Sequence, residues 1–381
     1  MLYRWLRPVL WRLDAEAAHH LAVAALKLLA ALPPIGWLLR RTFFQAAFDK
    51  RLAYELFGKR VLNPIGLAAG FDKNGEAIGG LQTLGFGFVE VGTVTPLGQP
   101  GNPKPRIFRL PKDEALINRL GFNNGGAAAL RERLSRGHAG LVGVNIGKNK
   151  DTPADEAGSD YARVFSEVAD VADYVVVNIS SPNTPGLRRL QATEALRPLL
   201  ARLLALRAES AVPALPLLIK VAPDLSDEDF DDVLTLALDL GMDGLVLTNT
   251  TIAREELATP RAELAEAGQG GLSGPPLRQR SLTLLRRAAQ RARGRMVLIS
   301  VGGVADVDDV WQRLEAGADA IQLYTSLVYR GPGLPAALSA GLLARLGAAG
   351  YESLPEYLAH RAARPSADAE RISFRPRPAA S

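Results

Sequence analysis

The chain has 381 residues, of which 48% are hydrophobic, and a formal net charge of +5. It contains no cysteine, which excludes disulfide bonds, thiolate nucleophiles and cysteine-held zinc or iron–sulfur centres. Its histidines are scattered, so no metal site is expected. The mild positive charge favours an anionic ligand or a lipid surface, and the lack of a basic stripe indicates that nucleic acid is not a partner.

Residues 1–45 are expected to form an apolar helical hairpin that is broken at Pro33-Pro34. Its longest uncharged run, 28–39, is too short and too interrupted for a transmembrane span, and it lacks the pattern of a signal peptide. Trp5, Trp11 and Trp37, with flanking arginines, favour a helix pair that lies in a membrane interface. The alternative is a helix pair that packs onto the rest of the protein.

Short segments rich in aliphatic and β-branched residues alternate with helical patterns along residues 46–345. The expected strands cover 64–69, 86–92, 141–146, 174–179, 217–221, 244–248, 296–301 and 320–324. The expected helices cover 76–84, 126–136, 161–172, 193–208, 227–240, 278–292 and 307–316. Their N-caps are expected at Ser159 or Asp160, at Ser226 and at Asp306. This alternation predicts an α/β fold, and its repetition favours a closed (β/α)8 TIM barrel over an open doubly wound sheet.

Two connections are too long for a plain barrel, and the chain continues beyond the last expected strand. Residues 93–125 are expected to form an insertion over the barrel mouth, and residues 249–276 a flexible lid or ligand-clamping loop. Both leave from the carboxyl ends of strands, where barrels carry their active sites. Residues 346–381 are expected to be a largely disordered extension, because the tail after Ala362 is rich in proline, alanine and arginine.

The segment 178–187, Asn-Ile-Ser-Ser-Pro-Asn-Thr-Pro-Gly-Leu, follows one of the buried strands. Two prolines and a glycine fix its backbone, so the polar side chains between them can be aimed at a ligand. On composition alone the segment could equally be an ordinary polar loop. The other strand ends favour a site, because they also carry amides, lysines and glycines.

Lys220 is the sharpest single signal, because it lies in an otherwise apolar strand where it needs an anionic partner or a lowered pKa. A structural salt bridge is the alternative. Asn145, Asn178 and Asn249 follow three strands and suit a planar heterocycle, although each could instead cap a loop. Gly302-Gly303 lies where barrels bind phosphate. With no Rossmann fingerprint in a βαβ context, a flavin is favoured over a nicotinamide cofactor.

With these residues assembled, the chain resembles the quinone-dependent (class 2) dihydroorotate dehydrogenases over about residues 1–345. The resemblance rests on an ordered series of motifs: Ala-Ala-Gly-Phe-Asp-Lys-Asn-Gly, Val-Gly-Thr-Val-Thr-Pro, Pro-Arg-Ile-Phe-Arg-Leu, Ile-Asn-Arg-Leu-Gly-Phe-Asn-Asn, Asn-Ile-Gly-Lys-Asn-Lys, the 178–187 segment, Thr-Asn-Thr-Thr, Gly-Gly-Leu-Ser-Gly and Gln-Leu-Tyr-Thr. The absence of cysteine agrees with this class, since class 1 relatives generally use a cysteine base.

The resemblance implies oxidation of (S)-dihydroorotate to orotate in de novo pyrimidine (UMP) biosynthesis, with FMN as cofactor and a membrane quinone as electron acceptor. It implies that Ser181 removes the C5 proton while the C6 hydride passes to flavin N5, and Thr184 is the candidate to hold a relay water. The protein is then expected at the cytoplasmic side of the inner membrane as a peripheral protein. The competing hypotheses are another FMN barrel oxidoreductase with a different electron partner and a non-catalytic membrane-surface binding protein.

The resemblance also implies three sets of ligand-binding residues. FMN is expected to contact Ala69, Gly70, Phe71, Asp72, Lys73, Thr93, Asn145, Asn178, Lys220, Thr248, Gly274, Gly303, Tyr324 and Thr325. The substrate is expected to contact Lys73, Asn118, Arg119, Leu120, Gly121, Phe122, Asn178, Asn183, Asn249 and Thr250. The quinone site, between the N-terminal helices and the barrel mouth, is expected to include His19, Arg109 and Tyr324, although the neighbouring His20 leaves the histidine assignment open.

Overall fold

The structure is a computed structural model that describes residues 2–363. Its centre is a closed barrel of parallel strands in the order β10-β11-β12-β14-β15-β3-β4-β9. The strands are β3 (Ile65–Leu67), β4 (Phe88–Val94), β9 (Leu141–Ile146), β10 (Tyr174–Asn178), β11 (Leu217–Val221), β12 (Gly244–Leu247), β14 (Val297–Val301) and β15 (Ala320–Leu323). All the expected strands are present, so the (β/α)8 prediction is confirmed and the open sheet is wrong.

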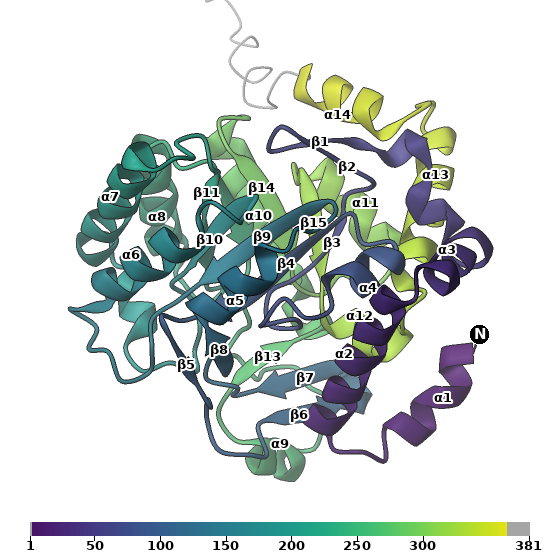
Figure 1. Cartoon of the computed structure of the whole chain (residues 1–381), viewed down its shortest axis with the longest axis horizontal. Coiled ribbons are helices and arrows are strands. Elements are labelled where there is room, and N and C mark those ends of the chain that lie inside the picture. The colour runs from purple at the N-terminus through teal and green to yellow at the C-terminus, as the bar shows by residue number, and fades with distance from the viewer. Residues whose placement is uncertain (1, 364–381) are drawn as a thin grey trace, which may run out of the picture.

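Helices surround the barrel and bury the outer faces of its strands (Figure 1). They are α4 (Ile78–Thr83), α5 (Ala127–Leu134), α6 (Ala157–Val168), α7 (Thr193–Glu209), α8 (Asp227–Asp239), α10 (Arg278–Ala292), α11 (Val307–Glu315), α12 (Thr325–Arg330) and α13 (Leu334–Ala348). Because side chains fill the inside and helices cover the outside, every residue of β10 and β11 is buried. This explains why these strands are continuous apolar runs.

Two of the three predicted N-caps are confirmed. The Ser226 side chain accepts the backbone N–H of Asp229, and Asp306 forms a capping box with Asp309. The cap expected at Ser159 or Asp160 is wrong, because α6 already begins at Ala157. The Asp160 carboxylate instead accepts the backbone N–H of Asn149 at 2.8 Å, and so holds the loop after β9.

The two long insertions meet over the barrel mouth. The first contains β5 (Leu97–Gln99), β6 (Ile107–Leu110), β7 (Ala115–Asn118) and β8 (Asn124–Gly126), and the second contains α9 (Arg261–Ala267) and β13 (Gly271–Ser273). Strand β13 pairs antiparallel with β7, giving a three-stranded sheet in the order β13-β7-β6. A small separate core of Leu110, Ala115, Ile117, Ala267 and Leu272 holds the insertions together. The segment 249–276, expected to be a flexible lid, therefore contains a strand and a helix joined to the other insertion.

The opposite end of the barrel is closed by the hairpin of β1 (Tyr54–Leu56) and β2 (Lys59–Val61) and by α14 (Leu354–Ala363), as Figure 1 shows. Helix α14 buries Leu354 and Tyr357, and the Arg361 guanidinium donates to Asp319 at 2.7 Å. The expectation of disorder is therefore wrong for this part of 346–381, because an amphipathic helix precedes the proline-rich tail. Residues 364–381 lie outside the described residues.

The N-terminal segment forms three helices rather than a simple hairpin: α1 (Leu2–Leu10), α2 (Ala15–Ala31) and α3 (Pro33–Thr42). Pro33 begins α3, and the chain bends by 102° between α2 and α3. Helix α2 packs closely on α4, where a Cβ at Gly80 would lie 2.3 Å from the Leu26 carbonyl oxygen. Within residues 2–363 no single helix is long and apolar enough to cross a membrane; only the bent α2–α3 pair passes, by length and composition.

Candidate active site

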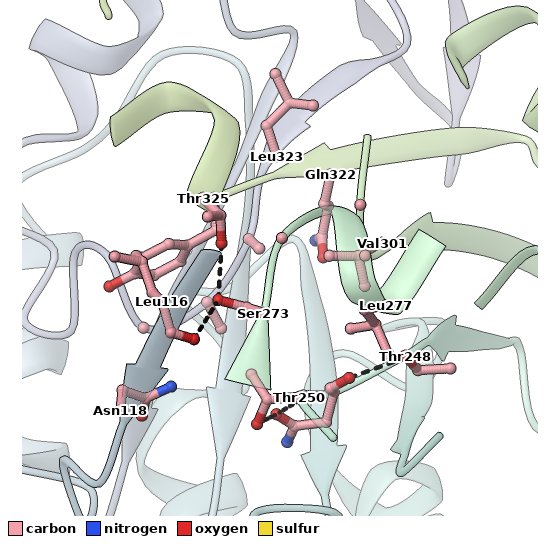
Figure 2. A pocket seen from close by; sticks show the side chains of 18 of the residues that line it. Leu116, Asn118, Thr248, Thr250, Ser273, Leu277, Val301, Gln322, Leu323 and Thr325 are labelled. Carbon is pink, nitrogen blue, oxygen red and sulfur yellow. Dashed lines mark hydrogen bonds between the residues drawn. The ribbon is translucent and has the colours of Figure 1, made fainter. Parts of the chain in front are cut away.

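A cavity lies at the carboxyl ends of the barrel strands, beneath the β13-β7-β6 sheet. Figure 2 shows Thr248, Val301 and Gln322 of the barrel with Leu116, Asn118 and Ser273 of the insertions. The Thr325 hydroxyl donates to Ser273 Oγ at 2.7 Å and so links the end of β15 to β13. The cavity is therefore built jointly by strand ends and insertions.

Most of the predicted ligand-binding residues line this cavity. From the cofactor set they are Ala69, Gly70, Lys73, Thr93, Asn178, Lys220, Thr248, Gly274, Gly303, Tyr324 and Thr325. From the substrate set they are Lys73, Asn118, Leu120, Gly121, Phe122, Asn178, Asn183, Asn249 and Thr250, and Ser181 lies among them. Among the residues predicted to bind FMN or the substrate or to act in catalysis, Phe71, Asp72, Arg119, Asn145 and Thr184 do not line it.

The side chains of Asp72 and Arg119 are engaged outside the cavity, so any contact of these residues with a ligand would be through the backbone and stays a prediction. The Asp72 carboxylate is buried and accepts the backbone N–H groups of Glu76 and Ala77, at 2.8 and 2.7 Å. The Arg119 guanidinium lies 4.5 Å from the ring centre of Phe108 and donates to the carbonyls of Ala267 and Pro105. Asp72 thus shapes the turn after β3, and Arg119 ties the two insertions together.

Lys220 lies in β11 beside Asn178 of β10 and is 5% exposed. Burial lowers the pKa of its ammonium group, and the charge of Glu90 on β4 opposes that shift. Within residues 2–363 its Nζ atom has no hydrogen-bond or ion-pair partner. The structural salt bridge considered from the sequence is therefore absent among these residues, and the amine faces the cavity.

Lys73 approaches the cavity from the loop after β3. Desolvation lowers the pKa of its ammonium group to about 7; the positive charge of Arg106 contributes to this shift, and Glu16 opposes it. The amine donates to Asn123 Oδ1 in the first insertion. An anionic ligand in the cavity would favour the charged form of Lys73.

The three amides singled out from the sequence are connected by hydrogen bonds. Asn178 Nδ2 donates to Thr93 Oγ1 and Asn145 Oδ1, at 3.0 and 3.1 Å. Asn249 Nδ2 donates to Asn178 Oδ1 at 3.3 Å. Asn145 lies behind the other two and supports them, and its contact with the cofactor stays a prediction.

The structure adds two residues that the sequence reasoning missed, Glu90 and Gln322. Both are fully buried, and Gln322 also lines the cavity. Glu90 carries the same signal that selected Lys220, a charged residue inside an apolar strand, and could have been found by it. Gln322 belongs to the Gln-Leu-Tyr-Thr motif but has no signal of its own.

The loop 178–187 presents Ser181 to the cavity. Ser181 is 6% exposed, and its Oγ accepts the backbone N–H of Asn183 at 3.2 Å. Asn183 Nδ2 donates to Asn118 Oδ1 at 3.2 Å, which connects the loop to β7. Thr184 is buried, and its Oγ1 has no partner among the described residues. The loop is thus held with one hydroxyl at the cavity and a second, unpaired hydroxyl close behind it in sequence.

A second, mainly apolar channel of about 290 Å³ lies between the N-terminal helices and the barrel. His19, Arg109 and Tyr324 line it, as expected of the quinone site, and so does Phe71, whose ring centre lies 4.9 Å from that of His19. Burial lowers the pKa of His19 to about 4, with further lowering by Lys73 and His20. The side chain of His20 is largely exposed and faces Glu16, outside this channel.

The two cavities share a wall made by Ile107, Leu116 and Tyr324. Burial raises the pKa of Tyr324 to about 12, so its hydroxyl is neutral at physiological pH. Arg109 frames the channel by donating to the carbonyls of Trp11 and Leu13, at 3.2 and 3.0 Å. The cavity at the strand ends and the apolar channel therefore lie on opposite sides of these three side chains.

Comparisons with known proteins agree with this architecture. The family profile "Dihydroorotate dehydrogenase" matches residues 51–346. The chain is 49% identical over 363 residues to the dihydroorotate dehydrogenase (quinone) of Thermobifida fusca, covering 93% of this chain and 96% of that protein. It is 48% identical over 356 residues to the corresponding Mycobacterium tuberculosis protein, covering 93% and 97% of the two chains.

Solved structures show the same likeness. The ligand-free DHODH from Eimeria tenella superposes with a TM-score of 0.80 at 38% sequence identity, covering 91% of this chain and 99% of that one. The Eimeria tenella DHODH in complex with ferulenol superposes with a TM-score of 0.78 at 38% identity, covering 91% and 96%. The chain belongs to the dihydroorotate dehydrogenase family, in its quinone-dependent class.

Proposed function

We propose that this protein oxidises (S)-dihydroorotate to orotate in de novo UMP biosynthesis, with FMN as cofactor and a membrane quinone as electron acceptor. The observation that carries the proposal is the partition of Ile107, Leu116 and Tyr324 between the polar cavity and the apolar channel. An enzyme that links a polar substrate to an apolar acceptor needs both sites within reach of one redox centre. Membership of the dihydroorotate dehydrogenase family supports the same activity.

The cavity fits FMN on three counts. Gly303 has φ +73, and a Cβ there would lie 2.6 Å from the Arg278 Cα, so only glycine fits this turn, which follows the seventh barrel strand, where barrels commonly bind phosphate. Ser326 Oγ lines the same region, buried and without a partner. Lys220 supplies a buried amine that lacks an acceptor and would stabilise negative charge on a flavin ring. When bound, FMN supplies the two-electron acceptor that no side chain of this protein can provide.

The remaining cavity residues suit a small anion with ring N–H and carbonyl groups. Lys73 would pair with the substrate carboxylate, since a neighbouring anion favours the charged form of the lysine. Asn118, Asn183 and Asn249 offer both donors and acceptors to the ring. The apolar Leu120 and Phe122 would exclude water from it.

Ser181 is the proposed base that removes the C5 proton of dihydroorotate. Its Oγ accepts the Asn183 N–H, which leaves the hydroxyl hydrogen free to be passed on. Serine is a weak base unless that proton has a path away. The unpaired Oγ1 of Thr184, in the same loop, is the proposed holder of a relay water, because a buried hydroxyl without a partner gains a hydrogen bond from it.

The N-terminal segment 1–45 is proposed to dock the 46–345 barrel on the cytoplasmic face of the inner membrane as a peripheral protein. Helix α2 packs on the barrel through one side, while exposed apolar side chains remain on the helices. They include Trp5, Val9, Leu28, Trp37 and Phe43. This arrangement combines the two alternatives drawn from the sequence, with one face packed and one face free for lipid.

Anaerobic mixing of the purified protein with dihydroorotate tests the proposal. The visible absorbance of the oxidised flavin is expected to bleach and then return when a quinone is added. A flavin that stays oxidised would favour another FMN barrel oxidoreductase. A protein that purifies without flavin and takes up none would favour the non-catalytic membrane-surface protein.

A further inference from the structure

We propose that Arg313 and Arg278 are positioning residues that hold the turn after β14 so that its backbone N–H groups bind the phosphate of FMN. Neither arginine lines the cavity, and each acts through a carbonyl of the turn. The inference rests on the proposed function, because it concerns the end of the cavity assigned to the FMN phosphate. It gives a role to two residues, from α10 and α11, that touch no ligand themselves.

Both carbonyls of the glycine pair are held from outside the cavity. The Gly302 carbonyl accepts hydrogen bonds from the Arg313 guanidinium and from the Ser281 hydroxyl, the latter at 2.9 Å. The Gly303 carbonyl accepts from Arg278 Nε at 3.1 Å. These three donor residues do not line the cavity. The two carbonyls therefore point toward α10 and α11, away from the cavity.

The direction of these carbonyls fixes the direction of the N–H groups that follow them. The peptide bonds that join Gly302, Gly303 and Val304 are trans, and in a planar trans peptide the N–H points opposite to the C=O. The N–H groups of Gly303 and Val304 thus point toward the cavity, which both residues line. Within residues 2–363 neither N–H makes a hydrogen bond. Buried backbone N–H groups nearly always have a partner, so a ligand in the cavity is the expected one.

Arg313 also carries a charge that has no carboxylate of its own. It is 1% exposed, and burial lowers the pKa of its guanidinium to about 10, so the group stays charged at neutral pH. Its other hydrogen bonds go to neutral groups, including the Ser300 and Ser281 hydroxyls at 2.7 and 2.9 Å. The Asp309 carboxylate favours the charged form of Arg313 but pairs with Arg278 Nε at 2.9 Å. An anion bound nearby would stabilise this buried cation.

A phosphate group suits this arrangement. Among the described residues, the cations that line the cavity are Lys73 and Lys220, which the proposed function assigns to the substrate carboxylate and the flavin ring. A guanidinium that donates to a carbonyl polarises that peptide, and the N–H on its other side becomes a stronger donor. Arg313 therefore favours an anion at the turn through the Gly302 peptide, without entering the cavity.

Riboflavin is FMN without its phosphate, so the two flavins together test this role. Titration of the apoprotein, followed by flavin fluorescence, gives both affinities, and their ratio is the preference for FMN. Arg313→Met removes the charge from a side chain of similar shape. The preference is expected to fall about tenfold or more, while riboflavin affinity stays within about threefold of native. Arg313→Lys keeps the charge and is expected to retain more of the preference than Arg313→Met.

Arg287→Met is the matched control. Arg287 also lies on α10, and its loss changes the net charge equally, but it pairs with Asp231 and Asp227 of α8. The control should keep the native preference, and a fall equal to that of Arg313→Met would overturn the proposal. An unchanged preference in Arg313→Met would also overturn it. So would a loss of riboflavin affinity as large as the loss of FMN affinity, because Arg313 would then only support the fold.

Further variants decide the matter if Arg313→Met does not fold. Arg313→Gln keeps a donor for the Gly302 carbonyl but not the charge, and is expected to lower the preference for FMN. Arg278→Met carries less risk to folding, because the Arg278 side chain is 42% exposed. It removes the donor to the Gly303 carbonyl and is expected to lower the preference by less than Arg313→Met. A native preference in the folded variants would overturn the proposal.

Failure of the proposed function has a different signature. A native apoprotein that binds neither flavin would contradict the proposed function. Inorganic phosphate then tests the turn alone: it should raise the thermal midpoint of the native apoprotein above the value in chloride of equal ionic strength, and raise that of the Arg313 variant less. An equal rise in both proteins would overturn the role of Arg313. A native protein that binds FMN beside a variant with unchanged preference would overturn this inference alone.

Discussion

The two ends of the barrel differ in whether their polar side chains have partners within the protein. At the base, Asp173, Asp243 and Asp319 each precede a strand, and each carboxylate accepts a backbone N–H of the neighbouring strand. The donors are Val142, Leu217 and Leu298, at 2.7, 2.9 and 2.9 Å. Each carboxylate also meets a cation, namely Lys59, Arg207 and Arg361 in turn. The base therefore leaves none of these charges for a ligand.

At the mouth, polar groups stand at the strand ends without such partners. Lys220 Nζ, Thr184 Oγ1 and Gln322 Oε1 have no hydrogen-bond acceptor or donor within residues 2–363. Unpaired buried polar groups cost stability, of the order of 1–3 kcal/mol each. We infer that the paired carboxylates at the base stabilise the fold, whereas the unpaired polar groups at the mouth lower its stability and are available to bind a ligand. Variants at the two ends should therefore separate activity from stability.

The largest expected effect is on catalysis at the mouth. Ser181→Ala is expected to retain FMN and the native thermal midpoint but to reduce flavin reduction by dihydroorotate about 10²–10⁴-fold, the usual contribution of a general base. Anaerobic stopped-flow absorbance measures the rate. A near-native rate of flavin reduction would reject Ser181 as the base. A large fall in the thermal midpoint would show that residues at the mouth also stabilise the fold.

The base should show the reverse behaviour. Asp319→Ala removes the acceptor of the Leu298 N–H and the partner of Arg361, so the free energy of unfolding is expected to fall by about 1–3 kcal/mol. The rate of flavin reduction per bound FMN should stay native. Asp308→Ala, which breaks an exposed ion pair with Arg345, is the control and should change stability by less than about 0.5 kcal/mol. Urea unfolding measures the free energy of unfolding of both variants. Equal losses in the two would contradict the expected difference between the buried ion pair of Asp319 and the exposed ion pair of Asp308.

Binding at the mouth should depend on pH through Lys73, whose pKa is lowered to about 7. Below that pH the amine is charged and attracts an anion; above it the free protein loses the charge. Orotate affinity is therefore expected to fall as pH rises above about 7, by at most tenfold per pH unit, and not to fall in Lys73→Gln. Orotate titrations followed by flavin absorbance measure it. If orotate affinity falls with pH as steeply in Lys73→Gln as in the native protein, a group other than Lys73 is responsible.

The smallest expected effect lies outside both ends, on the helices α1 and α3. Replacing Trp5 and Trp37, which are 80% and 61% exposed, by alanine should weaken binding to anionic lipid vesicles several-fold and leave dihydroorotate-dependent flavin reduction unchanged. Ile252→Ala is the control, since this residue is 56% exposed on the second insertion. Equal weakening by the control would point to non-specific adsorption. Vesicle co-sedimentation measures the binding.

Much of the site was visible in the sequence because it depends on local patterns. An apolar run that ends in Lys220, or in the 178–187 loop, marks a buried strand and its carboxyl end, and parallel strands bring such ends together. Glu90 was missed because attention fell on strand ends, whereas its side chain acts from within a strand. The side-chain directions of Asp72 and Arg119 could not be predicted, because adjacency to ligand residues in sequence does not tell which way a side chain points.

The sequence by itself determined the barrel, the family and most of the residues around the cavity, because strand periodicity and ordered motifs are local. Only the tertiary structure decided how distant segments complete the site. The pairing of β13 with β7 joins two insertions far apart in the chain, and α2 reaches the same wall from the N-terminus. The surroundings of Glu90 are also a tertiary property, because its carboxylate on β4 accepts hydrogen bonds from Asn145 and Gln322, which are both distant from it in sequence.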